Sequence, residues 1–187
     1  LRPTRGGGKN PYLKHLRDLE SRDDERVLNP DDLVGQPLSV LREKAACCQA
    51  CPLHQAATGT VMGEGPVDAE IMIVEEQPGD HEDLLGRPFV GPAGQLLDRL
   101  MTEAGIDRSQ CYVTNAVKHF KFVPKGKQRI HQSPTADEVS RCKPWLVAEL
   151  LEVKPRVLIF LGATAARSLI GPGFKITRQR GEVYETG

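Results

Sequence analysis

Long hydrophobic runs are missing from this sequence. The longest apolar stretch, residues 157–166, falls far short of the roughly 20 residues that a membrane-spanning helix needs. A basic segment followed by an apolar one, as in a secretory leader, is not found at the start of the chain either. These two absences predict a soluble cytoplasmic protein that has no membrane partner.

Net charge is also lacking, because 25 basic residues balance 25 acidic ones. A neutral chain cannot attract nucleic acid with its whole surface, so any such attraction must come from a local patch. Residues 118–131 carry five basic side chains, no acidic one, and Phe120 and Phe122 between them. A basic loop without function is the plain alternative, but this composition is typical of a loop that faces phosphates. We expect DNA contacts from Lys118, Lys125, Lys127 and Arg129.

Cysteine is scarce, and its odd count of five argues against a disulfide framework. Cys48 and Cys51 form a C-x-x-C pair, and Cys142 stands alone far along the chain. A structural zinc site usually closes with a second tight pair, which is not found here, whereas an iron-sulfur cluster accepts scattered ligands. The residues leave the fourth ligand open among Cys47, Cys111 and His119.

A length of 187 residues suits one domain with a substantial core. Glycines and a dense run of charges at the start predict a flexible tail or linker over residues 1–35, with one short helix at residues 12–20. The domain is expected over residues 36–187. The chain starts at Leu1 rather than Met, and we expect it to be a piece of a longer protein in which the domain is truncated at its C-terminus.

Alternating apolar runs and helical periods predict the α/β class. Buried strands are expected at residues 69–74, 111–117 and 157–161, and helices at 93–104, 135–151 and 163–170. A further helix after Pro37 is expected to lead into the cysteines. Strands separated by helices favour a parallel sheet covered on both faces, which binds ligands at the carboxyl ends of its strands. Polar residues follow all three predicted strands, at 75–80, 115–119 and 162–164.

Several motifs resemble a known family. Glu-Gln-Pro-Gly-Asp at 76–80, Arg-Pro-Phe-Val-Gly-Pro-Ala-Gly at 87–94, Tyr-Val-Thr-Asn at 112–115 and Leu-Gly-Ala-Thr-Ala at 161–165 are similar to the iron-sulfur uracil-DNA glycosylases of family 4. Lys-His-Phe at 118–120 and Arg-Ile-His at 129–131 resemble the UdgX branch more narrowly. The resemblance runs from about residue 38 to the end of the chain. It implies the three-layer, parallel-sheet fold of uracil-DNA glycosylases and a role in base excision repair of DNA damage.

The resemblance also implies roles for individual residues. Family 4 has cysteine where this chain has His119, so the implied ligands of a [4Fe-4S] cluster are Cys48, Cys51, His119 and Cys142, and Cys111 belongs to the core. Phe89 would stack on a uracil flipped out of DNA, and Asn115 would pair with its polar edge. Plain core packing is the alternative for Phe89.

Cleavage of the glycosidic bond leaves a uracil anion and a cation-like sugar, so donors and negative charge are needed nearby. The loop after the first strand supplies the candidates. Glu76, Gln77 and Asp80 are expected to be catalytic, and Gly79 and Asp83 to help bind the substrate, although an ordinary acidic surface loop is the alternative. The family usually has glycine where this chain has Glu75, and the added carboxylate is expected to crowd the base.

In the UdgX branch, the histidine that corresponds to His131 attacks the sugar once uracil leaves and joins the protein to DNA. The resemblance therefore implies a single-turnover enzyme that acts as a monomer on uracil in single-stranded DNA or flipped from a duplex, in association with the nucleoid. A neutral imidazole is a competent nucleophile, and its product is a stable N-glycoside. The alternatives are a uracil-DNA glycosylase that turns over and a non-catalytic module that binds uracil or single-stranded DNA.

Overall fold

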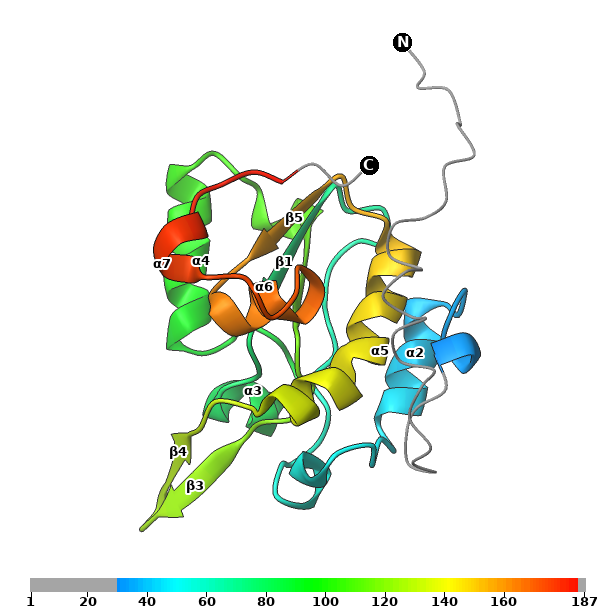
Figure 1. The fold of residues 1–187 in the computed structure, drawn as a ribbon, viewed down its shortest axis with the longest axis vertical. Helices are drawn as coiled ribbons and strands as arrows, with labels where there is room; N and C mark the ends of the chain where they lie inside the picture. The colour runs from blue at the N-terminus through cyan, green and yellow to red at the C-terminus, as the bar shows by residue number, and fades with distance from the viewer. Residues whose placement is uncertain (1–29, 185–187) are drawn as a thin grey trace.

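The computed structural model of the chain describes residues 30–184 (Figure 1). The expected helix at residues 12–20 and most of the expected tail lie outside this range. Within it, none of the helices has the length and apolar character that crossing a membrane requires.

A three-stranded parallel sheet forms the centre of the molecule. It consists of β1 (Ile71–Glu75), β2 (Cys111–Asn115) and β5 (Val157–Phe160), in the order β2-β1-β5. The register pairs Ile71 with Cys111 and with Val157, so the three strands run side by side and end at one edge. This confirms the predicted α/β class and the three apolar runs as strands.

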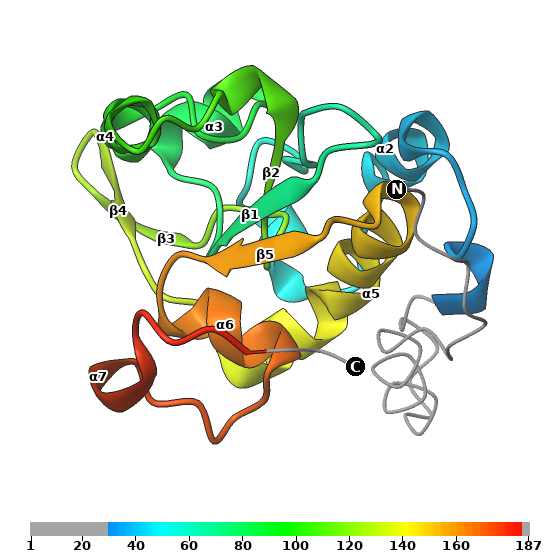
Figure 2. The same cartoon turned by 90° about the horizontal axis from the view of Figure 1, so that it is seen from above.

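Helices cover both faces of this sheet, which makes three layers (Figure 2). On one face lie α3 (Asp80–Leu85) and α4 (Pro92–Glu103), and on the other lie α5 (Ala136–Val153) and α6 (Ala163–Leu169). Side chains alternate between the faces along each strand. Ile73 therefore packs against α4 through Met101, whereas Met72 and Val74 join the cluster that contains Leu146 and Leu150 of α5.

A second core region lies beside the sheet, where α2 (Leu38–Ala45) packs against α5 (Figure 1). The 3-10 helix η2 (Pro52–Gln55) follows α2, and the segment between them contributes Cys48 and Cys51 to this region. Cys142 and Trp145 of α5 complete it. Thr135 and Glu138 form a capping box that fixes the start of α5, as the sequence predicts.

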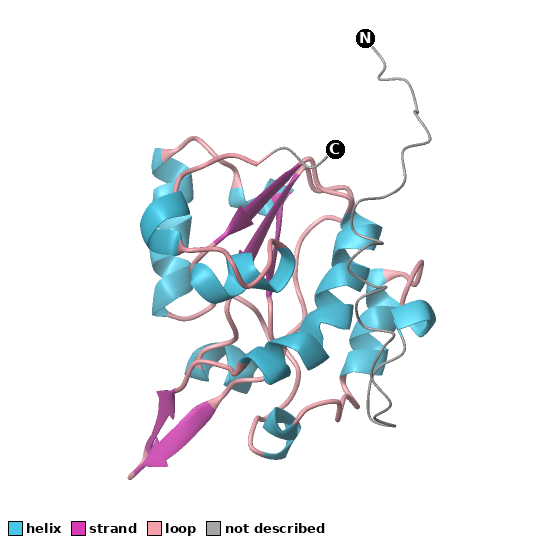
Figure 3. Ribbon diagram, in the orientation of Figure 1, coloured by secondary structure: helices cyan, strands magenta, loops and turns pink. Residues whose placement is uncertain are grey.

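The structure corrects the expected basic loop, because residues 118–131 contain a β-hairpin that projects from the body (Figures 1 and 3). Its strands are β3 (Phe122–Lys125) and β4 (Gln128–His131), joined by a turn in which Gly126 has a φ of 60°. Pro124 lies inside β3, and because proline usually argues against a strand, the sequence pattern does not predict one here. The remaining short elements are η1 (Pro30–Asp32), η3 (Arg108–Gln110) and α7 (Ile176–Gln179).

Candidate functional site

The predicted site residues gather where β1 and β2 end. Glu75 and Asn115 are the last residues of their strands and are partners in the register. The backbone continues the pairing, because Ala116 N donates to Glu75 O at 2.7 Å and Val117 N donates to Glu76 O at 3.0 Å. The loops after the two strands therefore leave the sheet together, which places both motifs at one edge.

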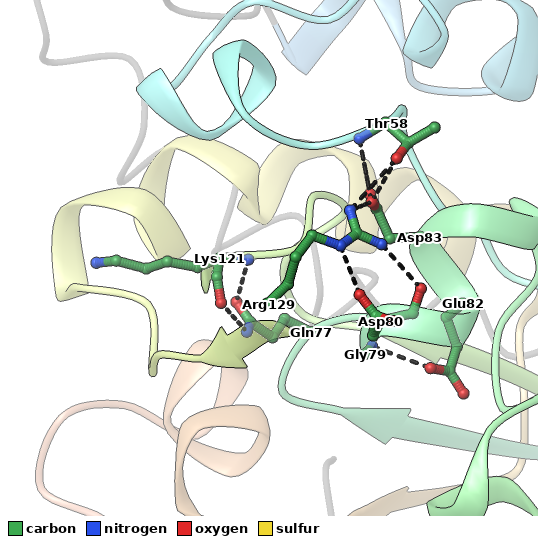
Figure 4. Close-up of polar contacts among 8 residues, drawn as sticks. All are labelled: Thr58, Gln77, Gly79, Asp80, Glu82, Asp83, Lys121 and Arg129. Carbon is green, nitrogen blue, oxygen red and sulfur yellow. Dashed lines mark hydrogen bonds and ion pairs between the residues drawn. The ribbon is translucent and has the colours of Figure 1, made fainter. Parts of the chain in front are cut away.

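Gln77 joins the base of the hairpin to the loop that follows β1 (Figure 4). Its side-chain nitrogen donates to the carbonyl oxygens of Lys121 and Gln132, each at 3.1 Å, and its side-chain oxygen accepts from Lys121 N at 3.2 Å. Gln77 is only 3% exposed. Its amide thus holds the two ends of the hairpin against the end of β1.

Arg129 fixes the outer part of the hairpin onto α3 (Figure 4). Its Nε donates to Asp80 Oδ1 at 2.5 Å and its terminal nitrogen donates to Asp83 Oδ2 at 2.6 Å. The guanidinium carbon also lies 5.4 Å and 5.1 Å from the ring centres of Phe120 and Phe122. Charge-assisted hydrogen bonds and cation–π contacts favour a single orientation of the hairpin.

The consequence of this orientation is that His131 faces the loop after β1. His131 Nε2 lies 3.6 Å from Glu76 Oε1, and the histidine side chain is half exposed. The structure therefore brings together two residues that the sequence separates widely, the imidazole of His131 and the carboxylate of Glu76.

Asn115 and Phe89 form the inner part of the site. Asn115 is 1% exposed, and neither its Oδ1 nor its Nδ2 has a hydrogen-bond partner within residues 30–184. Leaving a buried polar group unpaired costs about 1–3 kcal/mol, so a ligand that satisfies this amide gains that free energy. Phe89 is buried on the same face of the sheet, against the cluster that contains Ile73 and Val113.

The loop that carries Phe89 has a strained and closely packed backbone. Phe89 has a φ of 59°, which side chains rarely adopt, and a Cβ atom at Gly94 would lie 1.8 Å from Phe89 O. Glu82 stabilises the loop, since its two carboxylate oxygens accept from Gly79 N at 3.1 Å and Gly91 N at 2.6 Å. Sequence reasoning missed this role of Glu82, although its position in the first turn of a helix is a usual one for a capping carboxylate.

Three cysteines meet in the core region between α2 and α5. Cys48, Cys51 and Cys142 belong to one buried cluster, where Trp145 Nε1 lies 3.3 Å from Cys48 Sγ and Lys118 N lies 3.1 Å from Cys142 Sγ. Burial raises the pKa of the Cys142 thiol to about 12. N–H groups that donate to the sulfur atoms favour ligation by thiolates at this place.

His119 is the best placed of the candidates for a fourth ligand. It is 3% exposed, its Nδ1 has no hydrogen-bond partner within residues 30–184, and it directly follows Lys118, whose N–H reaches Cys142. Burial, together with the nearby His54, lowers the pKa of His119 to about 4, so the imidazole is in the neutral form that binds metals. By contrast, Cys47 is exposed and Cys111 belongs to the other core cluster, beside Ile73.

The side chains of this region are of the types that bind metals. Within residues 30–184, no three histidine, cysteine, aspartate or glutamate side chains lie close enough together to hold a single metal ion. A cluster of several iron and sulfide atoms holds its ligands farther apart than one ion does. Three buried thiols and a buried, unpaired imidazole are ligand types that both zinc sites and iron-sulfur clusters use.

The predicted DNA contact of Lys118 is wrong, because its side chain is buried inside the protein. It is 0% exposed, and its Nζ donates to Glu149 Oε2 at 2.6 Å, to Thr114 Oγ1 at 2.7 Å and to Asn115 O at 2.7 Å. Glu149 of α5 is equally buried. Its position between the apolar Leu146 and Leu150 is the signal in the sequence that points to this buried pair.

The other predicted contact residues divide into two groups. Lys125 and Lys127 are exposed on the hairpin, as a phosphate contact requires. Arg129 is engaged by carboxylates, and Asp83 is 2% exposed and also accepts from the backbone and hydroxyl of Thr58 at 3.0 Å and 2.7 Å. Arg129 and Asp83 therefore support the site from within the protein, and sequence reasoning did not identify Thr58.

Comparison with known proteins agrees with this geometry. Residues 62–186 match the model of the family described as "Uracil DNA glycosylase superfamily". The chain is 39% identical over 145 residues to a type-4 uracil-DNA glycosylase of Thermotoga maritima, a match that covers 77% of this chain and 72% of the relative. A type-4 uracil-DNA glycosylase of Archaeoglobus fulgidus is 37% identical over 159 residues, covering 83% and 72%. A type-5 uracil-DNA glycosylase of Pyrobaculum aerophilum is 31% identical over 121 residues, covering 57% and 50%.

Proposed function

This chain belongs to the uracil-DNA glycosylase superfamily, and from that premise we propose that it excises uracil from DNA and is then joined covalently to the sugar through His131. The observation that carries the proposal is the buried, unpaired amide of Asn115 beside Phe89. Such a pair suits a flat base that has been flipped out of the helix.

The Asn115 amide distinguishes uracil from cytosine. Uracil offers an N3–H donor next to a carbonyl acceptor, so Oδ1 accepts from N3–H while Nδ2 donates to the carbonyl oxygen. With the amide in this orientation, cytosine places its N3 acceptor against Oδ1 and its amine against Nδ2, so neither hydrogen bond forms. A site built to hydrogen-bond one partner rejects the other because of this cost.

Glu76 and His131 perform the chemistry in this proposal. The bond between the anomeric carbon and N1 of uracil breaks, and uracil leaves with the electron pair. The Glu76 carboxylate stabilises the positive charge that develops on the sugar. The His131 Nε2 lone pair then forms a bond to the anomeric carbon, and the imidazolium loses its Nδ1 proton to water. Gln77 and Asp80 contribute by holding the hairpin that carries His131.

Cys48, Cys51, His119 and Cys142 would hold a [4Fe-4S] cluster. When bound, the cluster supplies covalent cross-links between the segment after α2, the segment after β2, and α5. These residues then keep the backbone near Asn115 in place. Lys125 and Lys127 contact phosphates from the exposed face of the hairpin, which orients uracil-containing DNA toward the site. The protein acts on this DNA as a monomer.

A conventional glycosylase that turns over is the second candidate, favoured by the names of the type-4 relatives. A denaturing gel after incubation with a uracil-containing oligonucleotide separates the two. Covalent capture gives a heat-stable, slowly migrating protein-DNA band, whereas turnover gives free abasic DNA.

His131→Ala tests the assignment of the nucleophile. We expect the covalent band to disappear, uracil release to continue, and DNA affinity to stay within about twofold, because the phosphate contacts come from the neighbouring lysines. Glu76→Gln should slow uracil release itself, by about 100-fold, since it removes the charge that stabilises the sugar. A covalent band that persists with alanine at position 131 would show that the nucleophile is another residue.

A further inference from the structure

The pleat of the sheet places Glu75 beside the candidate base-binding residues. Residues two apart along a strand extend from the same face, so Glu75 shares a face with Ile73, and Asn115 shares one with Val113. The register pairs Ile73 with Val113 and Glu75 with Asn115, and the first pair packs in the cluster that contains Phe89. The Glu75 and Asn115 side chains therefore extend side by side, on the Phe89 face of the sheet.

The surroundings of the Glu75 carboxyl group are unusual for a structural residue. The side chain is partly buried, and no hydrogen bond from the described part of the chain is among the causes that shift its pKa. Burial, with added repulsion from Glu82 of α3 and Glu76 of the following loop, raises the pKa of Glu75 to about 7. Both neighbours have contacts of their own, since Glu82 accepts from two backbone N–H groups and Glu76 lies 3.6 Å from His131. A large fraction of Glu75 is therefore neutral near pH 7.

We propose that Glu75 is an additional base-recognition residue, whose carboxyl group contacts the flipped base next to the Asn115 amide. The inference rests on the proposed function and extends it, since it identifies a second specificity-determining side chain at that site. It is carried by the shared face and register of Glu75 and Asn115, and by the unpaired amide of Asn115.

The chemistry of the base explains what a neutral carboxyl group contributes. Uracil has two carbonyl oxygens that flank N3–H, and a single amide can satisfy N3–H and only one of the two. The O–H of a neutral Glu75 donates to a carbonyl oxygen that Asn115 leaves unpaired. Charge on the departing uracil spreads over these oxygens, so the same donor also favours bond cleavage. Ionised Glu75 has no donor and repels both oxygens, and recognition therefore weakens as pH rises through about 7.

Binding measurements test this contact without any cleavage. Two oligonucleotides are compared by fluorescence anisotropy, one with a 2′-fluorinated deoxyuridine that resists glycosidic cleavage and one with a tetrahydrofuran in place of the nucleoside. The ratio of their affinities reports the base contacts alone, because the phosphates are the same. For the wild-type protein, we expect this ratio to fall about tenfold between pH 6 and pH 8.5, the effect of losing one hydrogen bond and gaining a repulsion.

Three variants complete the test. Glu75→Gln keeps a donor of nearly the same shape at every pH, so its ratio should stay constant over this range. Glu75→Met, which has no donor, should show the low ratio even at pH 6. Glu70→Gln makes the same change of charge at an exposed position before β1, and should behave like the wild-type protein.

The outcomes separate this inference from the function on which it rests. A ratio that changes equally with pH in the wild-type protein and in Glu75→Gln would overturn the role of Glu75 while leaving uracil recognition intact. If neither protein prefers the uracil oligonucleotide at any pH, the proposed function itself fails, and the role of Glu75 with it. A uracil-dependent shift of the Glu75 carboxyl ¹³C signal in wild-type protein would support the contact without any substitution, and an unchanged signal would oppose it.

Discussion

The polar side chains near the candidate site differ in whether their buried donor and acceptor atoms have hydrogen-bond partners. Three of the four buried side-chain atoms without a partner in the described residues belong to Asn115 and His119, the two residues assigned to uracil and to the cluster. Gln77, which the sequence equally suggested as a catalytic amide, has both of its polar atoms engaged. Hydrogen-bond satisfaction thus separates buried side chains whose polar atoms are unpaired in the described residues from side chains that are already engaged within the protein.

The identity of the fourth cluster ligand is testable at this scale. We expect Cys111→Ser to leave the iron and sulfide content unchanged, because Cys111 packs in a different core cluster. His119→Cys should retain the cluster, since thiolate is the common ligand, and should change its electron paramagnetic resonance spectrum. His119→Ala should lose iron. Loss of iron in Cys111→Ser alone would reverse the assignment.

The raised pKa of Glu75 also predicts how the stability of the protein depends on pH. Its pKa rises from 4.5 in the unfolded chain to about 7 in the folded one, so the folded state favours the neutral form. The contribution of this group to stability is fully present below pH 4.5 and is lost as pH rises toward 7. The shift corresponds to at most about 3 kcal/mol.

Urea denaturation of the wild-type protein and Glu75→Gln measures this effect. The variant should gain about 1–3 kcal/mol relative to wild type between pH 5 and pH 8, because glutamine does not ionise. Glu70→Gln provides the exposed control and should gain nothing. An equal free-energy difference at both pH values would mean that burial does not perturb Glu75.

Among the elements, the β3–β4 hairpin depends most on contacts made outside itself. An isolated two-stranded hairpin is marginally stable, and this one contains Pro124. Arg129 and Gln77 tie it to α3 and to the loop after β1, at its outer part and at its base. Arg129 therefore helps to position His131, which follows it by two residues in β4.

Arg129→Met tests this positioning role. We expect the rate of covalent capture under single-turnover conditions to fall about 10- to 100-fold, because misplacing a nucleophile is costly, while uracil release changes less. Arg129→Lys keeps the charge but loses the fork of donors, so its capture rate should lie between that of the wild-type protein and that of Arg129→Met. Lys127→Met is the control, since it weakens DNA binding without changing the capture rate at saturating DNA. Equal losses in release and capture would contradict a role confined to His131.

A buried ion pair between Lys118 and Glu149 connects several elements of the molecule near the candidate site. Glu149 accepts from Gly63 N, Tyr112 Oη and Thr114 Oγ1 at 2.7, 3.0 and 2.8 Å, in addition to Lys118. These bonds connect α5, β2 and the segment before β1. Lys118 also reaches the backbone of Asn115 and, through its own N–H, the Cys142 thiol. Asn115 and the buried cysteines thus share one support.

Removing one partner of this pair should be severe. Lys118→Met leaves Glu149 buried without its counter-charge, which typically costs about 3–5 kcal/mol. We expect a lower melting temperature and less bound iron. The double variant Lys118→Met with Glu149→Gln should recover part of this loss, because it removes both charges and keeps an acceptor for the donors that Glu149 satisfies. A Lys118→Met protein with unchanged melting temperature would show that the pair contributes little.

The sequence by itself determined the α/β class and the positions of the three sheet strands, because each is a short apolar run whose burial depends on local pattern. It also marked the start of α5 through Thr135 and Glu138, which act within one turn. The C-x-x-C pair and Cys142 indicated a metal cluster, since their chemistry does not depend on knowing the fold.

Only the tertiary structure decided which charges face solvent. Lys118 and Lys125 look equivalent in a basic segment of the sequence. Lys118, however, forms a buried ion pair with Glu149, which lies 31 residues later in the chain. Arg129 likewise meets Asp80 and Asp83 across 49 and 46 residues, and Glu75 meets Asn115 across two strands. Composition reports how many charges a segment carries, whereas their partners depend on distances in space that folding alone establishes.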